Sequence, residues 1–168
     1  TFHIADKEVV LTHGSVIRVM IDYAILACGL NGRITIGDSP MFPANFDKIV
    51  DDLGLIKIAE YYKTHFNFTI LLEDFRLHKG IYSKTGHLHN VISVAPDNHT
   101  NIKLSNSYHK VYESHYEVTD VSNPIKTYTI PNSILNADCI INMPKLKTHK
   151  IAGITCCIKS FIGANSNK

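Results

Sequence analysis

The stretch Arg33-Ile34-Thr35-Ile36-Gly37-Asp38-Ser39-Pro40 is a short apolar run that ends in turn-forming residues. It predicts a strand that enters a loop. A second apolar run at residues 68–72 predicts another strand. Between the two runs, a helical periodicity starts near residue 45, breaks at Gly54 and continues to Tyr62. This order and spacing predict two parallel strands with helices packed on them.

The residues before this unit predict a further helix. Apolar side chains recur with helical spacing from Val16 onward, Ser15 is expected to cap the start, and Gly29 is expected to stop the helix. Because this apolar stretch contains Arg18 and Asp22 and is too short to span a bilayer, we expect no membrane partner.

The residues after the unit predict a return of the regular pattern. The expected elements are a strand at 127–130, helical turns at 131–136, a buried strand at 138–142, a loop at 143–150 and a helix at about 152–162 that ends at Gly163. We therefore predict a three-layer α/β fold, with a mainly parallel sheet and helices on both faces.

Residues from about 73 to 126 show a weaker pattern and are predicted to form an insertion. Alternating pieces at 91–94 and 111–118 suggest β-hairpin strands in an inserted layer. The 168 residues are expected to form a single α/β domain. The start at Thr1 and the ending at Lys168 suggest a piece of a longer protein.

The charge is unevenly distributed. The formal net charge is +2, too small for a nucleic-acid surface. Residues 139–168 contain five lysines and no carboxylate, which leaves residues 1–138 with twelve basic and fifteen acidic side chains, a charge of −3. Such asymmetry can mark a place where an anion is bound. The four cysteines form no C-x-x-C pair, so we expect reduced thiols and a cytoplasmic location.

The basic segment contains the strongest candidate site. Lys145, Lys147 and His149 alternate, so in an extended chain they would point the same way. In the expected helix, Thr155 and Lys159 would share one face, and the start of that helix would add its positive dipole. These groups could hold phosphate or carboxylate, with His149 as an acid or base. The alternative is a solvated basic loop.

Two further candidate positions precede this segment. Asp38, at a strand end, could orient a hydroxyl or a metal, or it could simply cap its loop. Thr12 and His13, before the first helix, could bind an anion and transfer a proton, although a capping histidine is the common alternative.

We expect no metal site, and no cofactor is indicated. His78, His87 and His89 lack a nearby cysteine or a carboxylate at a diagnostic spacing. On a helix, Cys156 and Cys157 would point apart, with Cys157 in the core. The chain has no P-loop, dinucleotide-binding, zincin or nucleophile-elbow motif.

Three blocks resemble domain-of-unknown-function family 362. They are Thr12-His13-Gly14-Ser15, Gly37-Asp38-Ser39-Pro40 and, most specifically, Pro144-Lys145-Leu146-Lys147-Thr148-His149 with Gly153-Ile154-Thr155 and Lys159. The resemblance implies an α/β fold and a shared polar site, without a settled reaction. The long midsection is similar to a branch associated with surface-polysaccharide genes. Ser160 departs from the family pattern, which has Asn there, and no iron–sulfur cysteine spacing is present.

These observations predict an enzyme domain that binds an anionic small molecule, a sugar phosphate or a hydroxy acid. Lys145, Lys147 and Lys159 would hold the anion, His149 or His13 would transfer a proton, and Asp38 would orient a hydroxyl or a metal. One alternative is a non-catalytic binding or assembly module in polysaccharide or cofactor biosynthesis. Another is a redox partner whose iron–sulfur module lies outside this chain. The oligomeric state is not indicated.

Overall fold

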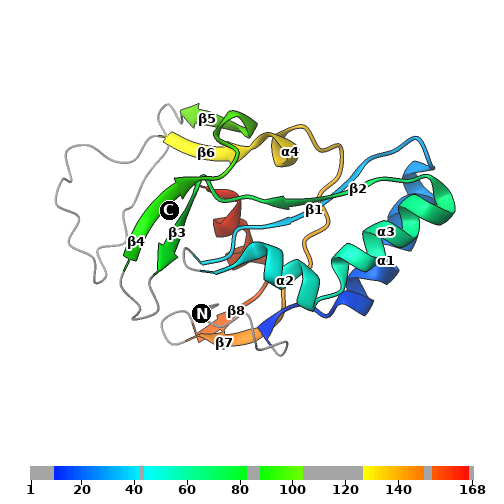
Figure 1. Cartoon of the computed structure of the whole chain (residues 1–168), viewed down its shortest axis with the longest axis horizontal. Coiled ribbons are helices and arrows are strands. Elements are labelled where there is room, and N and C mark those ends of the chain that lie inside the picture. The colour runs from blue at the N-terminus through cyan, green and yellow to red at the C-terminus, as the bar shows by residue number, and fades with distance from the viewer. Residues whose placement is uncertain (1–9, 42–43, 83–87, 104–126, 150–152, 167–168) are drawn as a thin grey trace.

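The computed structural model describes residues 10–41, 44–82, 88–103, 127–149 and 153–166. Its central unit is a pair of parallel strands, β1 (Ile34–Asp38) and β2 (Ile70–Asp74), in register from Ile34 opposite Ile70 onward. Helices α2 (Phe46–Asp52) and α3 (Leu55–Phe66) connect the two strands (Figure 1). The strand–helix–strand prediction is therefore confirmed, with the expected break at Gly54.

The first helix, α1 (Gly14–Cys28), ends at Gly29 as predicted. Its N-cap residue, however, is His13 and not Ser15, because the His13 ring nitrogen Nδ1 accepts a hydrogen bond from the backbone N–H of Ser15 at 3.2 Å. The start of α1 also lies against the turn between α2 and α3. A Cβ at Gly14 would overlap the carbonyl oxygen of Leu53, so only glycine permits this close approach.

The helices pack on one face of the β1–β2 pair. Ile36 and Leu72 project from the same face and join clusters with residues of α1, α2 and α3. Leu71, on the opposite face, is 52% exposed. In the ranges that the structure describes, the predicted helices on both faces are therefore not found, and the fold is α/β only in the broader sense of mixed helices and small sheets.

The remaining strands form antiparallel pairs. Strand β3 (His78–Tyr82) pairs with β4 (Leu88–Ser93), so the strand expected at 91–94 belongs to a hairpin. Strand β5 (His99–Lys103) pairs with β6 (Thr127–Pro131), which is followed by the short helix α4 (Asn132–Leu135). Because each sheet in the described ranges has two strands, the mainly parallel sheet is not found there. The strand expected at 111–118 lies outside the described residues.

The C-terminal part differs most from prediction. Residues 138–142 form no strand, and Ile140 and Ile141 are exposed. The expected helix at 152–162 is replaced by a hairpin of β7 (Lys147–His149) and β8 (Gly153–Thr155), followed by α5 (Cys157–Ser160) and the 3₁₀ turn η3 (Phe161–Ala164). Gly153 has φ +68°, a left-handed conformation that breaks a helix and suits a hairpin end.

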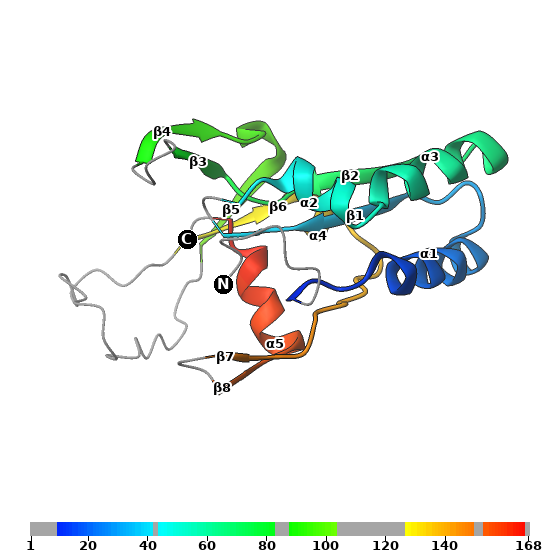
Figure 2. The same cartoon turned by 60° about the horizontal axis from the view of Figure 1, so that its bottom comes forward.

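The end of the described chain returns to the central strands. Ser166 donates its backbone N–H to the carbonyl of Thr129 in β6, and its hydroxyl donates to the carbonyl of Phe75, directly after β2. In Figure 2 the helical segment that begins with α5 runs from the β7–β8 hairpin toward the end of β1. Within the described ranges, no helix has both the length and the apolar character needed to cross a membrane.

Candidate functional site

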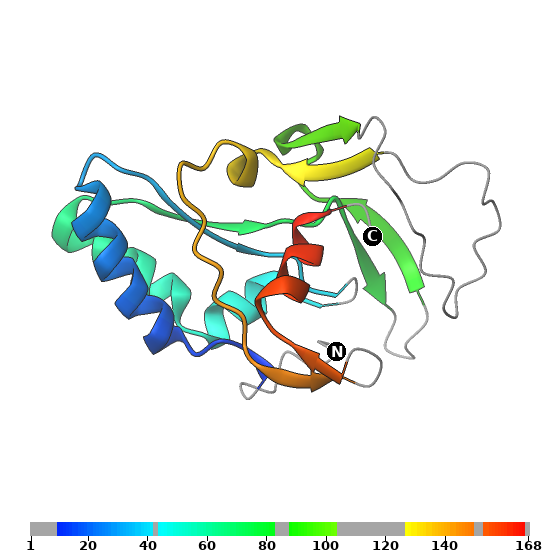
Figure 3. The same cartoon turned by 180° about the vertical axis from the view of Figure 1, so that it is seen from behind.

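Two segments far apart in sequence meet at the start of α1. The Thr12 hydroxyl donates to the carbonyl of Met143 at 2.6 Å, and the Lys147 ammonium donates to the carbonyl of Val10 at 3.1 Å. We call these four residues the N-terminal junction. Figures 1 and 3 show β7 passing close to the segment that leads into α1. The structure thus brings together the predicted anion-binding residues Thr12 and Lys147.

The two described lysines of the basic segment differ in environment. Lys145 precedes β7 and is exposed, whereas Lys147 is the first residue of β7 and is half-buried. Lys147 is partly buried where its ammonium group donates to the Val10 carbonyl. Thr148, the next residue, is exposed, as expected from the alternation of side chains along a strand.

His13 lies beside the junction in a capping role. Its Nδ1 atom lies 3.2 Å from the backbone nitrogen of Ser15 and 2.7 Å from the Ser15 hydroxyl oxygen. Because Nδ1 accepts the backbone N–H, a proton on the neutral ring is carried by Nε2. The observed contacts are those of a helix-capping histidine, and a proton-transfer role for His13 remains a prediction.

Asp38 also has a local structural role. It is the last residue of β1 and is exposed, and its carboxylate accepts a hydrogen bond from the Ser39 backbone N–H at 2.8 Å. Its carbonyl accepts from the Phe75 N–H at 2.9 Å. These bonds fix the exit of β1, as the loop-capping alternative predicts.

The other predicted anion-binding residues are arranged differently from the prediction. Thr155 is the last residue of β8, is buried, and lies with its hydroxyl 3.3 Å from the Lys147 carbonyl. It therefore supports the hairpin and does not share a helix face with Lys159. The helix α5 has four residues, so it supplies no long-helix dipole. The side chains of His149 and Lys159 lie outside the described residues.

Arg76, which the sequence patterns do not single out, organises the loop after Asp38. Its guanidinium group binds the Asp74 carboxylate and donates from Nη1 to the carbonyls of Met41 at 3.0 Å and Ala44 at 2.9 Å. The only signal in the sequence is an acidic and a basic residue two positions apart, just after a strand. Such pairs are common on surfaces, so the spacing alone does not predict burial.

A second polar cluster joins α1 to α3. The Tyr62 hydroxyl donates to the Asp22 carboxylate and accepts from Nε of Arg18 at 3.2 Å. Burial, together with the bond to Asp22, raises the pKa of Tyr62 above its ordinary value of 10.0. This cluster stabilises helix packing and contains none of the predicted site residues.

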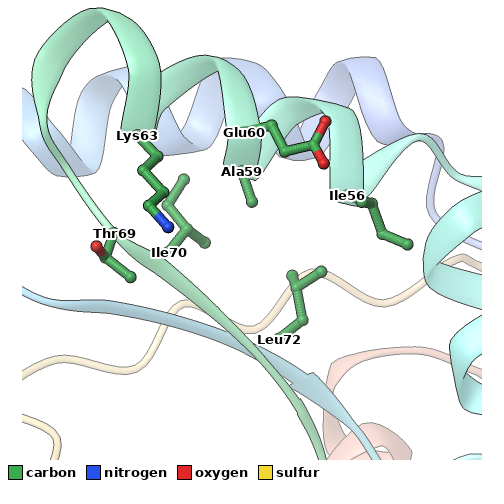
Figure 4. A pocket seen from close by; sticks show the side chains of 7 residues that line it. All are labelled: Ile56, Ala59, Glu60, Lys63, Thr69, Ile70 and Leu72. Carbon is green, nitrogen blue, oxygen red and sulfur yellow. The ribbon is translucent and has the colours of Figure 1, made fainter.

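An open cavity of about 220 Å³ lies between α3 and β2 (Figure 4). Its lining is mostly apolar, with Ile56, Ala59, Ile70 and Leu72 facing it beside three polar side chains, Glu60, Lys63 and Thr69. None of the predicted site residues lines this cavity. Among the described residues there is no group of three or more His, Cys, Asp or Glu side chains that could hold a metal ion.

Residues 94–168 match the family model described as "Domain of unknown function (DUF362)". The match includes the Pro144–His149 block, so the resemblance to family 362 is confirmed over this part of the chain. The comparison with curated proteins gives no match, and the comparison with solved structures gives none either. Because the family description names no activity, any function has to be argued from the residues themselves.

Proposed function

We propose that this chain binds an anionic small molecule, a sugar phosphate or a hydroxy acid, at the N-terminal junction. The observation that carries the proposal is the hydrogen bond from Lys147 to the Val10 carbonyl, at 3.1 Å. It sets a half-buried ammonium group against the segment that leads into α1. Partial burial reduces screening by water and strengthens attraction to an anion.

The surrounding charges support the same ligand class. Lys145 lies two residues before Lys147, and no acidic residue occurs between positions 139 and 168. The N-terminus of α1, a helix of 15 residues, adds positive potential near the junction. Thr12 fixes the distance between the two segments through its bond to Met143.

An enzymatic role would add proton transfer to this binding. We assign the candidate acid or base to His149 or to Nε2 of His13, and the orienting carboxylate to Asp38. Thr155 contributes by supporting the Lys147 backbone, and Lys159 is proposed as a further anion contact. Binding and catalysis are separate steps of the proposal, because each can fail without the other.

The experiment compares thermal stabilisation by inorganic phosphate in the parent chain and in Lys147→Met, which keeps the aliphatic stem and removes the charge. Lys48→Met is the matched control, because Lys48 is an exposed lysine of α2 paired with Asp52 at 2.6 Å. We expect phosphate to raise the Tm of the parent and of Lys48→Met, and to have a much smaller effect on Lys147→Met. Equal shifts in all three proteins would establish a solvated basic loop.

A second candidate, an assembly module, is favoured by exposed apolar side chains near the lysines. Leu146, Ile154, Ile158 and Phe161 are each more than half exposed, and Ile158 reaches 89%. Exposed apolar side chains that gather on one surface are typical of protein contacts. We expect the chain to self-associate in sedimentation equilibrium and Ile158→Ser to weaken that association. A parent chain that is monomeric at every concentration removes this candidate.

A further inference from the structure

The sulfur atoms of Cys156 and Cys157 lie 3.8 Å apart. Cys156 is half-buried in the bend between β8 and α5, and Cys157 is the exposed first residue of α5. The sequence predicted that the two thiols point apart and that Cys157 packs in the core, and both expectations are wrong. The reason is the change from strand to helix between the two residues, which replaces the continuous helix assumed for them.

The backbone around the pair is held from two directions. The Cys156 carbonyl accepts the Ser160 N–H at 3.1 Å, which closes the single turn of α5. The Cys157 carbonyl accepts a bond from the Asn142 side-chain amide at 2.8 Å. These two bonds hold the backbone of both cysteines and do not involve their sulfur atoms.

We propose that Cys156 and Cys157 form a dithiol that closes reversibly to a vicinal disulfide on reaction with a peroxide. One sulfur, as thiolate, attacks the peroxide, the O–O bond breaks, and a sulfenic acid and water result. The second sulfur then displaces hydroxide, which leaves as water with the remaining thiol proton. Two thiols and one hydrogen peroxide thus give one disulfide and two waters, with two electrons passing from sulfur to oxygen.

The electrostatics of the pair indicate a reaction that depends on pH. The hydrogen bond with Cys156, with a contribution from burial, raises the pKa of the Cys157 thiol. The raised pKa keeps the Cys157 thiol in its protonated, unreactive form near neutral pH. The oxidation is therefore expected to accelerate as pH rises.

Chain geometry predicts that the disulfide is easily reduced. Neighbouring Cα atoms are about 3.8 Å apart, below the usual spacing of about 4.4–6.8 Å for bridged cysteines. The resulting strain raises the reduction potential, which is a property of labile rather than structural disulfides. Closing the ring also changes the backbone at the junction of β8 and α5, so oxidation alters the turn that follows Thr155.

The test uses the full chain with Cys28→Ser and Cys139→Ser, which leaves only the pair. One equivalent of hydrogen peroxide is added, free thiols are alkylated, and the digest is analysed by mass spectrometry. We expect the peptide with both cysteines to lose the mass of two hydrogen atoms, to resist alkylation, and to recover two alkylation sites after brief treatment with glutathione. A further Cys157→Ser change should abolish the closed product and leave Cys156 as sulfenic or sulfinic acid.

Three results overturn the proposal: full alkylation of both cysteines, sulfinic acid on the paired cysteines, or a disulfide between chains. A measurement on the unsubstituted protein guards against variants that fail to fold. Phenylarsine oxide condenses with two neighbouring thiols, so we expect one arsenic bound per chain and protection of the Cys156–Cys157 peptide from alkylation. Failure of that protection shows that the sulfurs are not a usable pair. Neither measurement depends on anion binding at the N-terminal junction.

Discussion

The guanidinium group of Arg76 donates from Nη2 to Oδ2 of Asp74 at 2.5 Å, and the two side chains are only 4% and 9% exposed. The pair stands where β2 ends. From there Arg76 also reaches the carbonyls of Met41 and Ala44, and so fixes the loop that follows β1. A charge buried in this way is tolerated because the Asp74 carboxylate and the two carbonyls all accept hydrogen bonds from the guanidinium group. The geometry around Asp38 therefore depends on a residue that lies 38 positions further along the chain.

Replacing Arg76 with Met should destabilise the protein strongly. The substitution leaves the Asp74 carboxylate buried without its cation and two carbonyls without their donor. Removing one partner of a buried ion pair typically lowers the free energy of unfolding by about 3–5 kcal/mol. Urea unfolding measures the change. Lys48→Met is the comparison, because it breaks an exposed pair worth less than about 1 kcal/mol. Similar losses in both variants would contradict a structural role for the buried pair.

Thr12→Val removes the hydroxyl at the N-terminal junction with little change in shape. The lost bond to the Met143 carbonyl should cost about 1 kcal/mol of unfolding free energy. We also expect weaker stabilisation by phosphate, because the segment before α1 is released from its partner. Thr148→Val, at an exposed position of β7, should leave both quantities unchanged. Unaltered phosphate stabilisation in Thr12→Val argues against the junction as the binding site.

Gly14→Ala tests the close packing of α1 on the turn before α3. The new Cβ would overlap the Leu53 carbonyl oxygen, a backbone atom that cannot rotate away. Overpacking of this kind costs typically about 1–3 kcal/mol, despite the better helix propensity of alanine. Ser15→Ala, at the exposed neighbouring position, should cost less. The thermal unfolding midpoints of the two variants measure the difference. An unchanged midpoint in Gly14→Ala would mean that the start of α1 is packed more loosely against the turn between α2 and α3.

The raised pKa of Tyr62 predicts that the free energy of unfolding falls at high pH. Its pKa is raised above the ordinary 10.0 mainly by burial, then by the bond to Asp22, so the folded state holds the proton more tightly than the unfolded state. This contribution is complete below pH 10.0 and is lost as pH rises through the folded pKa. Tyr62→Phe should therefore show a shallower fall of urea midpoint above that pH than the parent. Parallel curves would exclude Tyr62 as the responsible group.

Local signals predicted the central unit well. The apolar runs at 33–37 and 68–72 predicted the parallel strands observed at 34–38 and 70–74, and Gly29 and Gly54 lie where helices end or break. These features depend on side-chain periodicity and backbone preferences over a few residues, which a single sequence displays directly. The C-terminal elements were predicted wrongly because residues 138–142 and 152–162 have apolar patterns that suit either a buried element or an exposed one. Whether such a segment is buried depends on which other strands and helices can pack against it in the folded chain.

The candidate site was predicted in part, for a related reason. Residue types and charge identified Thr12 and Lys147, but no spacing in the sequence indicates that Lys147 meets Val10, 137 positions away. Arg76 was missed and Thr155 was misplaced, since burial and the pairing of β8 with β7 are tertiary facts. The roles proposed for His149 and Lys159 remain predictions.

By itself, the sequence determined the strand–helix–strand unit, the basic segment without carboxylates and the family block at Pro144–His149. These are local properties, carried by composition and short-range periodicity. The tertiary structure alone decided that helices cover one face of β1–β2 and that Arg76 anchors the loop after Asp38. It also decided that the sulfur atoms of Cys156 and Cys157 lie together where the bend after β8 meets α5. Each of these outcomes depends on which distant groups are available as partners, and the chain acquires those partners only when it folds.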